Sequence, residues 1–163
     1  MSKSFTLIEV IVAVFLLTVG VGGVYVLVNQ AISSTTLLKN RLIAAYLAQE
    51  GIELVRNIRD TNWLGGTDWL NGISTSQPCG LDYQDNSCAP PLADTFFTID
   101  SDGFYSYTAG ILTTFKRIIN IEKQDLDGDN IADMAKVKVT VTWTGRGGSQ
   151  NSFTAVEHLY NWR

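Results

Sequence analysis

Apolar residues form one long, nearly uncharged run close to the start of the chain. Between Ser4 and Val28 the only charged residue is Glu9, and the next charge is Lys39. An α-helix rises about 1.5 Å per residue, so about 20 apolar residues cross the ~30 Å hydrocarbon core of a bilayer. The pattern therefore predicts a membrane-spanning helix over residues 5–28, with one acid in its first turn.

The helical pattern continues beyond the apolar run, but it becomes amphipathic. Residues 29–60 carry apolar side chains at helical spacing on two neighbouring stripes, with polar residues elsewhere. The first stripe contains Leu38, Leu42, Ala45, Ile52 and Val55, and the second contains Leu47, Gly51, Leu54 and Ile58. We expect one stripe to pack on a sheet, so that residues 5–60 form a single helix with a membrane half and a soluble half.

A loop and then a set of strands are predicted for the rest of the chain. Residues 61–93 are rich in Gly, Pro and Asn-Gly turn signals, and we expect Trp63 and Trp69 to pin this loop to the core. Residues 94–163 alternate between apolar and polar, as strands with one buried face do. The predicted fold is α+β: a long N-terminal helix packed on a C-terminal antiparallel sheet of about four strands.

The start of the apolar run carries a specific motif. Residues 5–9 read Phe-Thr-Leu-Ile-Glu and open a long apolar helix. This N-terminus resembles that of type IV pilins and type II secretion pseudopilins. The resemblance implies that a prepilin peptidase removes the leader, residues 1–4, by cutting between Ser4 and Phe5, and that it methylates the new Phe5 amine. The family usually has Gly before the cut, where this chain has Ser4, which is also small.

The same resemblance implies a role and a location. Glu9 is expected to meet the Phe5 amine of a neighbouring subunit, because a charge in apolar surroundings is costly unless it is paired. The protein is expected to be a single-pass protein of the inner or cytoplasmic membrane with a cytoplasmic N-terminus. It would then join an extracytoplasmic fibre, so its partners would be the prepilin peptidase, the membrane and other pilin or pseudopilin subunits.

Two other interpretations of the apolar run remain open from the residues alone. A secretory signal peptide has a shorter apolar core and an Ala-x-Ala-like cleavage site, and no such site follows the run closely. A plain membrane anchor would leave Glu9 without a function. The anchor would suit a membrane-anchored domain that never assembles, such as a calcium-binding adhesion domain or an extracytoplasmic enzyme.

The two cysteines lie in the turn-rich stretch after the predicted helix. Cys79 and Cys88 are placed beyond the membrane segment, which suits a disulfide in an oxidising compartment. Two free thiols are the alternative. A zinc site is disfavoured because the chain has no Cys-x-x-Cys pair and its one histidine, His158, is remote. The placement of these cysteines, together with an acidic loop, favours a minor pilin or pseudopilin.

That acidic loop is the one constellation with metal-binding chemistry. Its carboxylates are Asp125, Asp127, Asp129 and Asp133. Ca²⁺ takes 6–8 oxygen ligands, and alternate acids on a tight loop can converge on one ion, with the Ile131 carbonyl as a further ligand. The spacing resembles the calcium loops of thrombospondin type 3 repeats, with Asn130 where those carry Gly. An EF-hand is excluded, because its position 12 is Lys136. The alternative is a solvated acidic turn without an ion.

Charge and missing motifs narrow the function further. The formal net charge of −4 argues against nonspecific binding to nucleic acid, which uses clustered Lys and Arg. The chain lacks a GxSxG elbow, an HExxH motif and a phosphate-binding GxxxxGK[ST] loop. His158 is expected to lie on the surface or in sheet packing. The sequence therefore predicts no catalytic activity and no small-molecule substrate.

Overall fold

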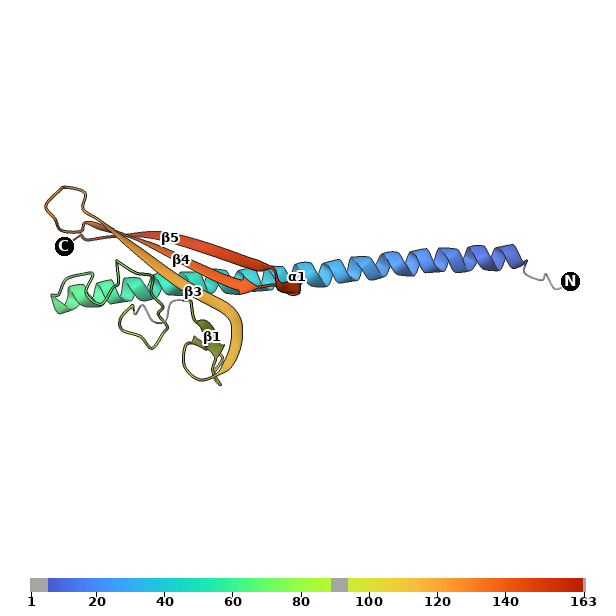
Figure 1. Ribbon diagram of the computed structural model, residues 1–163, viewed down its shortest axis with the longest axis horizontal. Coiled ribbons are helices and arrows are strands. Elements are labelled where there is room, and N and C mark those ends of the chain that lie inside the picture. The colour runs from blue at the N-terminus through green and yellow to red at the C-terminus, as the bar shows by residue number, and fades with distance from the viewer. Residues whose placement is uncertain (1–5, 89–93, 163) are drawn as a thin grey trace. The chain divides into compact units, whose positions relative to one another are not determined.

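The computed structural model describes residues 6–88 and 94–162, so Ser4 and Phe5 at the predicted cleavage position lie outside the described residues. The chain divides into two compact units, Met1–Lys39 and Asn40–Arg163. One helix, α1 (Leu7–Gly65), contributes residues to both units (Figure 1). The long N-terminal helix predicted from periodicity is therefore present.

The N-terminal unit is a bare apolar helix. Every described residue from Thr6 to Val28 is exposed to solvent. Among the described residues α1 is the one helix long and apolar enough to cross a membrane, with a mean hydropathy of 2.6 over its most apolar 18 residues. Its side chains make no core, because nothing in the isolated chain covers them.

The helix ends later than predicted, at Gly65 rather than at Asp60. Residues after Asp60 contain no helix breaker before the Gly pair, so the helix continues. Gly66 adopts a left-handed φ of 68° and stops it. The Gly66 N–H donates to the Trp63 carbonyl and the Thr67 N–H donates to the Asn62 carbonyl, which is the Schellman pattern. Trp63 therefore belongs to α1, not to the predicted loop.

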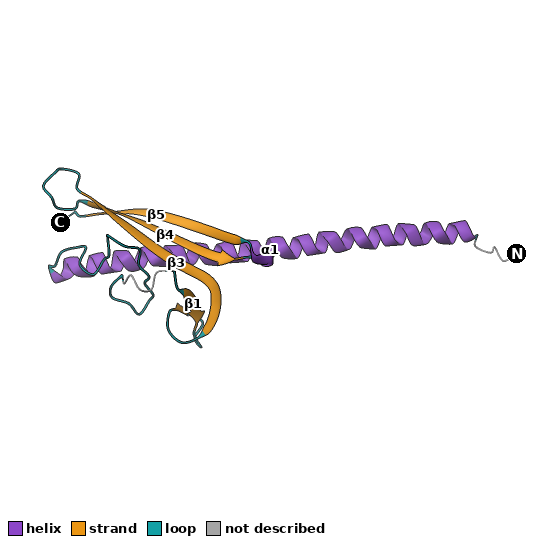
Figure 2. Ribbon diagram, in the orientation of Figure 1, coloured by secondary structure: helices purple, strands orange, loops and turns teal. Residues whose placement is uncertain are grey.

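The globular unit contains a five-stranded antiparallel sheet, one strand more than the predicted number of about four, in the order β2-β1-β3-β4-β5. Its strands are β1 (Phe96–Ile99), β2 (Tyr105–Ser106), β3 (Ile111–Gln124), β4 (Met134–Thr144) and β5 (Gln150–Tyr160). A short 3₁₀ segment, Arg146–Gly148, joins β4 to β5. Figure 2 shows the three long strands crossing the C-terminal part of α1. The predicted α+β fold is confirmed.

The core lies between α1 and the inward faces of β3 and β4. Val137, Val139 and Val141 are fully buried, as the alternation in β4 predicts. On the helix the buried apolar side chains are Ala44, Leu47, Ala48, Ile52, Val55, Ile58 and Trp63. The first predicted stripe is thus wrong at its N-terminal end, since Leu38 and Leu42 are exposed. Periodicity identifies an apolar face but not how far along the helix the sheet covers it.

One helical glycine sets how closely the helix and sheet approach. A Cβ atom built on Gly51 would lie 3.1 Å from both Arg117 Cδ and Val139 Cγ1. Any larger side chain would therefore push against the sheet at this level. Gly51, which the periodicity placed in an apolar stripe, is the position that admits the Arg117 side chain into the core.

Candidate functional site

Thr6 caps the N-terminal end of α1. The Glu9 backbone N–H lies 3.1 Å from the Thr6 carbonyl oxygen and 3.4 Å from Thr6 Oγ1. Thr6 and Glu9 also have the spacing of a capping box, in which a Ser or Thr and an acid three residues later satisfy the first backbone N–H groups of a helix. The cap at Thr6 could have been predicted, because the Thr-x-x-Glu spacing is visible in the sequence.

Beyond its cap, the N-terminal part of α1, up to Val28, presents an apolar surface on all sides. Leu7, Phe15 and Tyr25 are 81%, 63% and 71% exposed. A Cβ atom on Gly20 or Gly22 would meet no other atom within 4 Å. A continuous apolar surface of this extent requires lipid or other protein chains to cover it. Small residues such as these glycines also permit close packing of helices in a membrane.

Comparison with known protein families identifies this end of the chain. The family model for the prokaryotic N-terminal methylation motif matches residues 1–25. The N-terminus is that of the type IV pilin and pseudopilin family. No curated protein and no solved structure matches the chain. The motif and the long apolar helix suggest that the chain is anchored in a membrane as a structural subunit.

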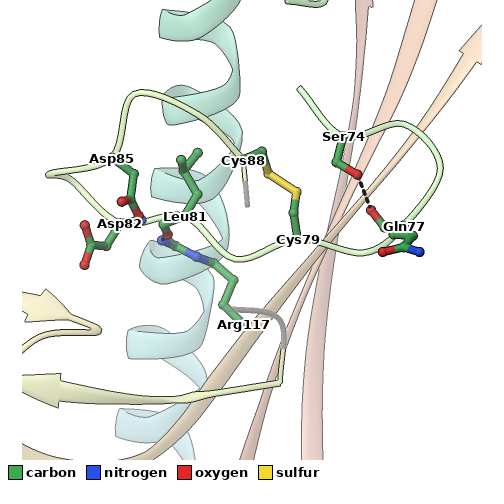
Figure 3. Close-up of a disulfide and its surroundings, with 8 residues drawn as sticks. All are labelled: Ser74, Gln77, Cys79, Leu81, Asp82, Asp85, Cys88 and Arg117. Atoms are coloured by element: carbon green, nitrogen blue, oxygen red, sulfur yellow. Dashed lines mark hydrogen bonds between the residues drawn. A yellow bond between two sulfur atoms is a disulfide. The ribbon is translucent and has the colours of Figure 1, made fainter. Parts of the chain in front are cut away.

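A disulfide fastens the loop that follows α1 to the edge of the sheet. Cys79 and Cys88 are bonded, as predicted, and both are buried (Figure 3). Cys79 and Ile119 of β3 exchange two backbone hydrogen bonds, of 2.9 and 3.0 Å. The Cys88 N–H donates to the Gly72 carbonyl at 2.9 Å. The loop is therefore held at both ends, once on the sheet and once on the chain that leaves the helix.

A buried arginine joins this loop to the helix. Arg117 of β3 is fully buried, and its Nη1 donates to the Leu47 carbonyl of α1 at 2.7 Å. Its Nη2 donates to the Leu81 carbonyl inside the disulfide loop, a contact that can be followed in Figure 3. The guanidinium also lies 4.9 Å from the centre of the Phe97 ring. One side chain thus bridges three segments that are far apart in the sequence.

Two carboxylates accompany this arginine. Glu50 Oε2 lies 3.7 Å from Arg117 Nη1, and burial raises the pKa of Glu50 although the arginine opposes that shift. Asp82 is buried and accepts hydrogen bonds from the backbone N–H groups of Gln84 and Tyr107, each at 2.9 Å. Burial also raises the pKa of the Tyr107 hydroxyl to about 12. The cluster is a structural anchor, because Arg117 and Asp82 both bind backbone groups of other segments.

The acidic loop between β3 and β4 brings together three of the predicted calcium ligands. Asp125, Asp127 and Asp133 each offer a carboxylate oxygen within 4.8 Å of the other two. Asp129 lies outside this group, and its Oδ1 accepts a hydrogen bond from the Ile131 N–H at 2.7 Å. Three carboxylates at such distances, two exposed and that of Asp133 half-buried, could provide part of the oxygen shell of one Ca²⁺ ion.

Hydrogen bonds from the backbone also shape this loop. Asp125 accepts from the Gly128 N–H at 2.7 Å and from the Asn130 N–H at 2.8 Å. These bonds, Gly128 first, lower the pKa of Asp125. Gly128 and Asn130 both have left-handed φ angles, of 85° and 69°. The position where the thrombospondin-type loops carry Gly is thus left-handed here, and Asn is among the few residues that tolerate it.

The other predicted residues fall outside these clusters. Trp69 is buried and its Nε1 donates to the Ala132 carbonyl at 3.1 Å, so it pins the loop after α1 to the end of the acidic loop. His158 is exposed on β5. The role of Arg117 was missed, although its inward position could have been read from the alternation of Phe115, Arg117 and Ile119 in one strand.

Proposed function

We propose that this chain is a minor pilin or pseudopilin, a structural subunit of a type IV pilus or a type II secretion fibre. Prepilin peptidase would cut between Ser4 and Phe5 and methylate the Phe5 amine, and the subunit would then pack through its N-terminal helix. One observation carries this proposal: the methylation motif opens a helix whose first 22 described residues are all exposed, while the same helix continues into the core of a folded unit.

Glu9 would align each subunit with its neighbour. After cleavage the Phe5 amine is a positive charge at the end of an apolar helix, and a carboxylate one turn along can pair with it. Removal of one partner of a buried ion pair typically costs about 3–5 kcal/mol, because the other charge is left unpaired. The capping box gives the same glutamate a second, local role, and the two roles can be separated by substitution.

Intact-mass and N-terminal analysis tests the processing step. The protein would be isolated from its native membrane with and without prepilin peptidase. We expect a chain that begins at methylated Phe5 only when the peptidase is present. A Ser4→Gly variant is the matched control, because it restores the residue that the family usually carries. A wild-type chain that still begins at Met1 while the control is cleaved would overturn the proposal.

The competing function is a single-pass, membrane-anchored domain that binds calcium and never assembles. It shares the apolar helix and the acidic loop but needs neither cleavage nor Glu9. Sheared fibres that contain the processed chain would support the pilin-type subunit. Intact chain that remains in the membrane fraction would support the anchored domain.

We also propose that the acidic loop binds one structural Ca²⁺ ion through Asp125, Asp127 and Asp133, with Asp129 and the Ile131 carbonyl completing the shell. The mutual approach of the first three carboxylates supports this proposal. The ion would offset their repulsion and stiffen the loop against Trp69. A thermal melt of the full chain in detergent, with Ca²⁺ and with a chelator, tests it.

A further inference from the structure

A cleft lies in the globular unit where α1 ends. Its volume is about 620 Å³, within the roughly 300–1,000 Å³ range of small-molecule sites. The lining comes from the end of α1, the loop after it, the end of β3, the acidic loop and the residue after β5. Figure 1 shows these segments at the same end of the globular unit. Segments far apart in the sequence therefore meet around a space that the proposed function does not use.

Hydrogen bonds brace the walls of this cleft. The Asn62 side-chain amide, on α1, donates to the Trp69 carbonyl of the loop at 3.2 Å. Across the cleft, Trp69 Nε1 donates to the Ala132 carbonyl at 3.1 Å. The Asn161 N–H donates to the Asp133 carbonyl at 2.7 Å, which ties the chain after β5 to the acidic loop. The cleft is therefore formed in advance, and a ligand binds without the cost of ordering its walls.

Tryptophan rings form the floor of the cleft and stand beside it. Trp63 and Trp69 line it, are 7% and 4% exposed, and have ring centroids 6.5 Å apart. Trp162 packs edge-on against Trp63, with centroids 4.5 Å apart, yet it is 70% exposed. Three of the four tryptophans of the chain thus meet here. The exposed ring of Trp162 offers a flat surface for the C–H groups of a ligand.

The rim of the cleft carries polar side chains of both signs. Among the described residues that line it, Asp68 is the one acid and Lys123 the one base, so the formal charge of the lining is zero. Within the described part of the chain, the side chains of Lys123, Asn130 and Asn161 form no hydrogen bond or ion pair. An Asn amide offers two donors and an acceptor, and Lys offers three donors. The rim can therefore bind several hydroxyl groups at once.

The chemistry of this lining favours one class of small ligand. An anion would meet a single ammonium group and the repulsion of the acidic loop, and a cation would prefer that loop to a site that contains Lys123. An apolar molecule would cover the rim and leave its polar groups without partners, which is costly. A neutral sugar fits both parts, because its hydroxyl groups bond to the rim and its C–H face covers an aromatic ring.

We propose that this cleft binds a neutral oligosaccharide. One sugar ring lies in the cleft, with its hydroxyl groups bonded to Lys123, Asn130 and Asn161, and an adjoining ring stacks on Trp162. The site gives the chain an adhesive function toward surfaces that carry such sugars. This function goes beyond the pilin-type role and does not rest on it, because the cleft is complete within one globular unit and needs neither cleavage nor a fibre.

The test measures disaccharide binding by the full chain in detergent. Maltose, cellobiose, lactose and N,N′-diacetylchitobiose would be titrated by calorimetry, with sialyllactose as the acidic comparison. The detergent must have no sugar headgroup, because a maltoside would compete for the cleft. Ca²⁺ would be held at about 10 mM, above the ~10⁻⁴–10⁻³ M range of extracellular calcium sites, so that the acidic loop is in one state throughout.

We expect at least one neutral disaccharide to bind with a dissociation constant of about 1 mM. Binding should also shift the tryptophan emission to shorter wavelength. Trp63, Trp69 and Trp143 are buried, so this shift reports on Trp162. Binding without an emission shift would place the sugar elsewhere and overturn the proposal.

Substitutions locate the site. Trp162→Ala should raise the dissociation constant about tenfold, and Lys123→Met about threefold. Their matched controls, Tyr160→Ala and Lys138→Met, change an exposed aromatic residue and an exposed lysine outside the cleft and should bind as the wild type does. Lys123→Met decides the test if Trp162→Ala lowers the melting temperature, since Trp162 also packs on Trp63.

Four results would overturn the proposal: no binding of any neutral disaccharide, binding of sialyllactose alone, unchanged affinity in both cleft variants, or an equal loss in a cleft variant and its control. None of these results bears on cleavage between Ser4 and Phe5, which is measured by mass. The cleft and the pilin-type function can therefore fail separately.

Discussion

The two ends of α1 are built for opposite surroundings. Between Thr6 and Val28 every residue is exposed and nearly all are apolar. Between Ala44 and Trp63 the apolar residues are mostly buried against a sheet, with polar residues on the other side. The first half therefore depends on molecules outside the chain, and the second half on the rest of the chain. The motif in the first half can consequently be recognised from sequence, whereas the anchor in the second is visible only in the fold.

Substitution of Glu9 should have the largest effect, and it should be confined to the N-terminal half. Glu9→Gln retains a capping-box residue but removes the charge, so we expect fibre assembly to be lost while membrane insertion and the melting temperature of the globular unit are unchanged. Thr6→Ala is the converse variant, because it removes the cap and keeps the charge. Assembly would be scored by the amount of subunit in sheared fibres. Normal assembly of Glu9→Gln would show that capping is the main role of this residue.

Arg117→Ala should give the largest effect in the globular half. The substitution leaves a cavity and removes the partner of the Leu47 and Leu81 carbonyls. We expect a loss of about 3–5 kcal/mol in the free energy of unfolding, measured by denaturant titration. Cleavage at Ser4 should be unchanged in the same protein. A defect in cleavage would show that the two halves are coupled.

Loss of the disulfide should lower the free energy of unfolding by less than Arg117→Ala does. The bridge closes a short loop, with a sequence separation of 9 residues. In the chain-entropy model a disulfide that closes such a loop stabilises the folded state by about 2.5–3 kcal/mol. Cys79→Ser/Cys88→Ser should lower stability by that amount, with Ser74→Ala as a loop control. An unchanged unfolding midpoint would mean that the Arg117 contacts alone hold the loop.

Calcium should stabilise the folded chain by an increment that depends on its free concentration. At a free concentration 100 times the dissociation constant, a ligand that binds only the folded state adds about 2.7 kcal/mol. We expect Ca²⁺ to raise the melting temperature of the wild type, and Asp127→Asn to abolish the rise. Asp102→Asn, in the hairpin between β1 and β2, is the control acid. A rise that survives in Asp127→Asn would place the ion elsewhere.

Glu50 should give the smallest effect. Because its pKa is raised in the folded state, the stability linked to this proton is present at low pH and is lost as pH rises through the folded pKa. Glu50→Gln should flatten that part of the stability–pH curve, as measured by denaturant titration across the acidic range. A steeper fall in the variant would mean that attraction to Arg117 outweighs burial.

The same contrast explains what the sequence could predict. The long helix and most strands follow from local periodicity, which is why the α+β fold and the alternation in β4 were predicted correctly. The helix end at Gly65 and the exposure of Leu38 and Leu42 were not predicted. The cap at Thr6 could also have been predicted from the sequence. The Arg117 anchor could not, because Arg117 binds the backbone carbonyls of Leu47 and Leu81, which are 70 and 36 residues away in the chain. No side-chain pattern marks a carbonyl as a partner.

The convergence on Arg117 has a mechanical consequence. Tension applied along α1 would load the helix–sheet interface in shear, because β5 runs in the direction of the helix. Leu47 contacts Arg117 at the level of Phe153, and Arg56 contacts Glu157 further along both elements. The bonds from Arg117 to the Leu47 and Leu81 carbonyls and the Cys79–Ile119 pair would then be strained together rather than in succession. Resistance to a pulling force depends on the barrier to unfolding. The globular unit should therefore yield in one abrupt step, at a force that falls when Arg117 is replaced.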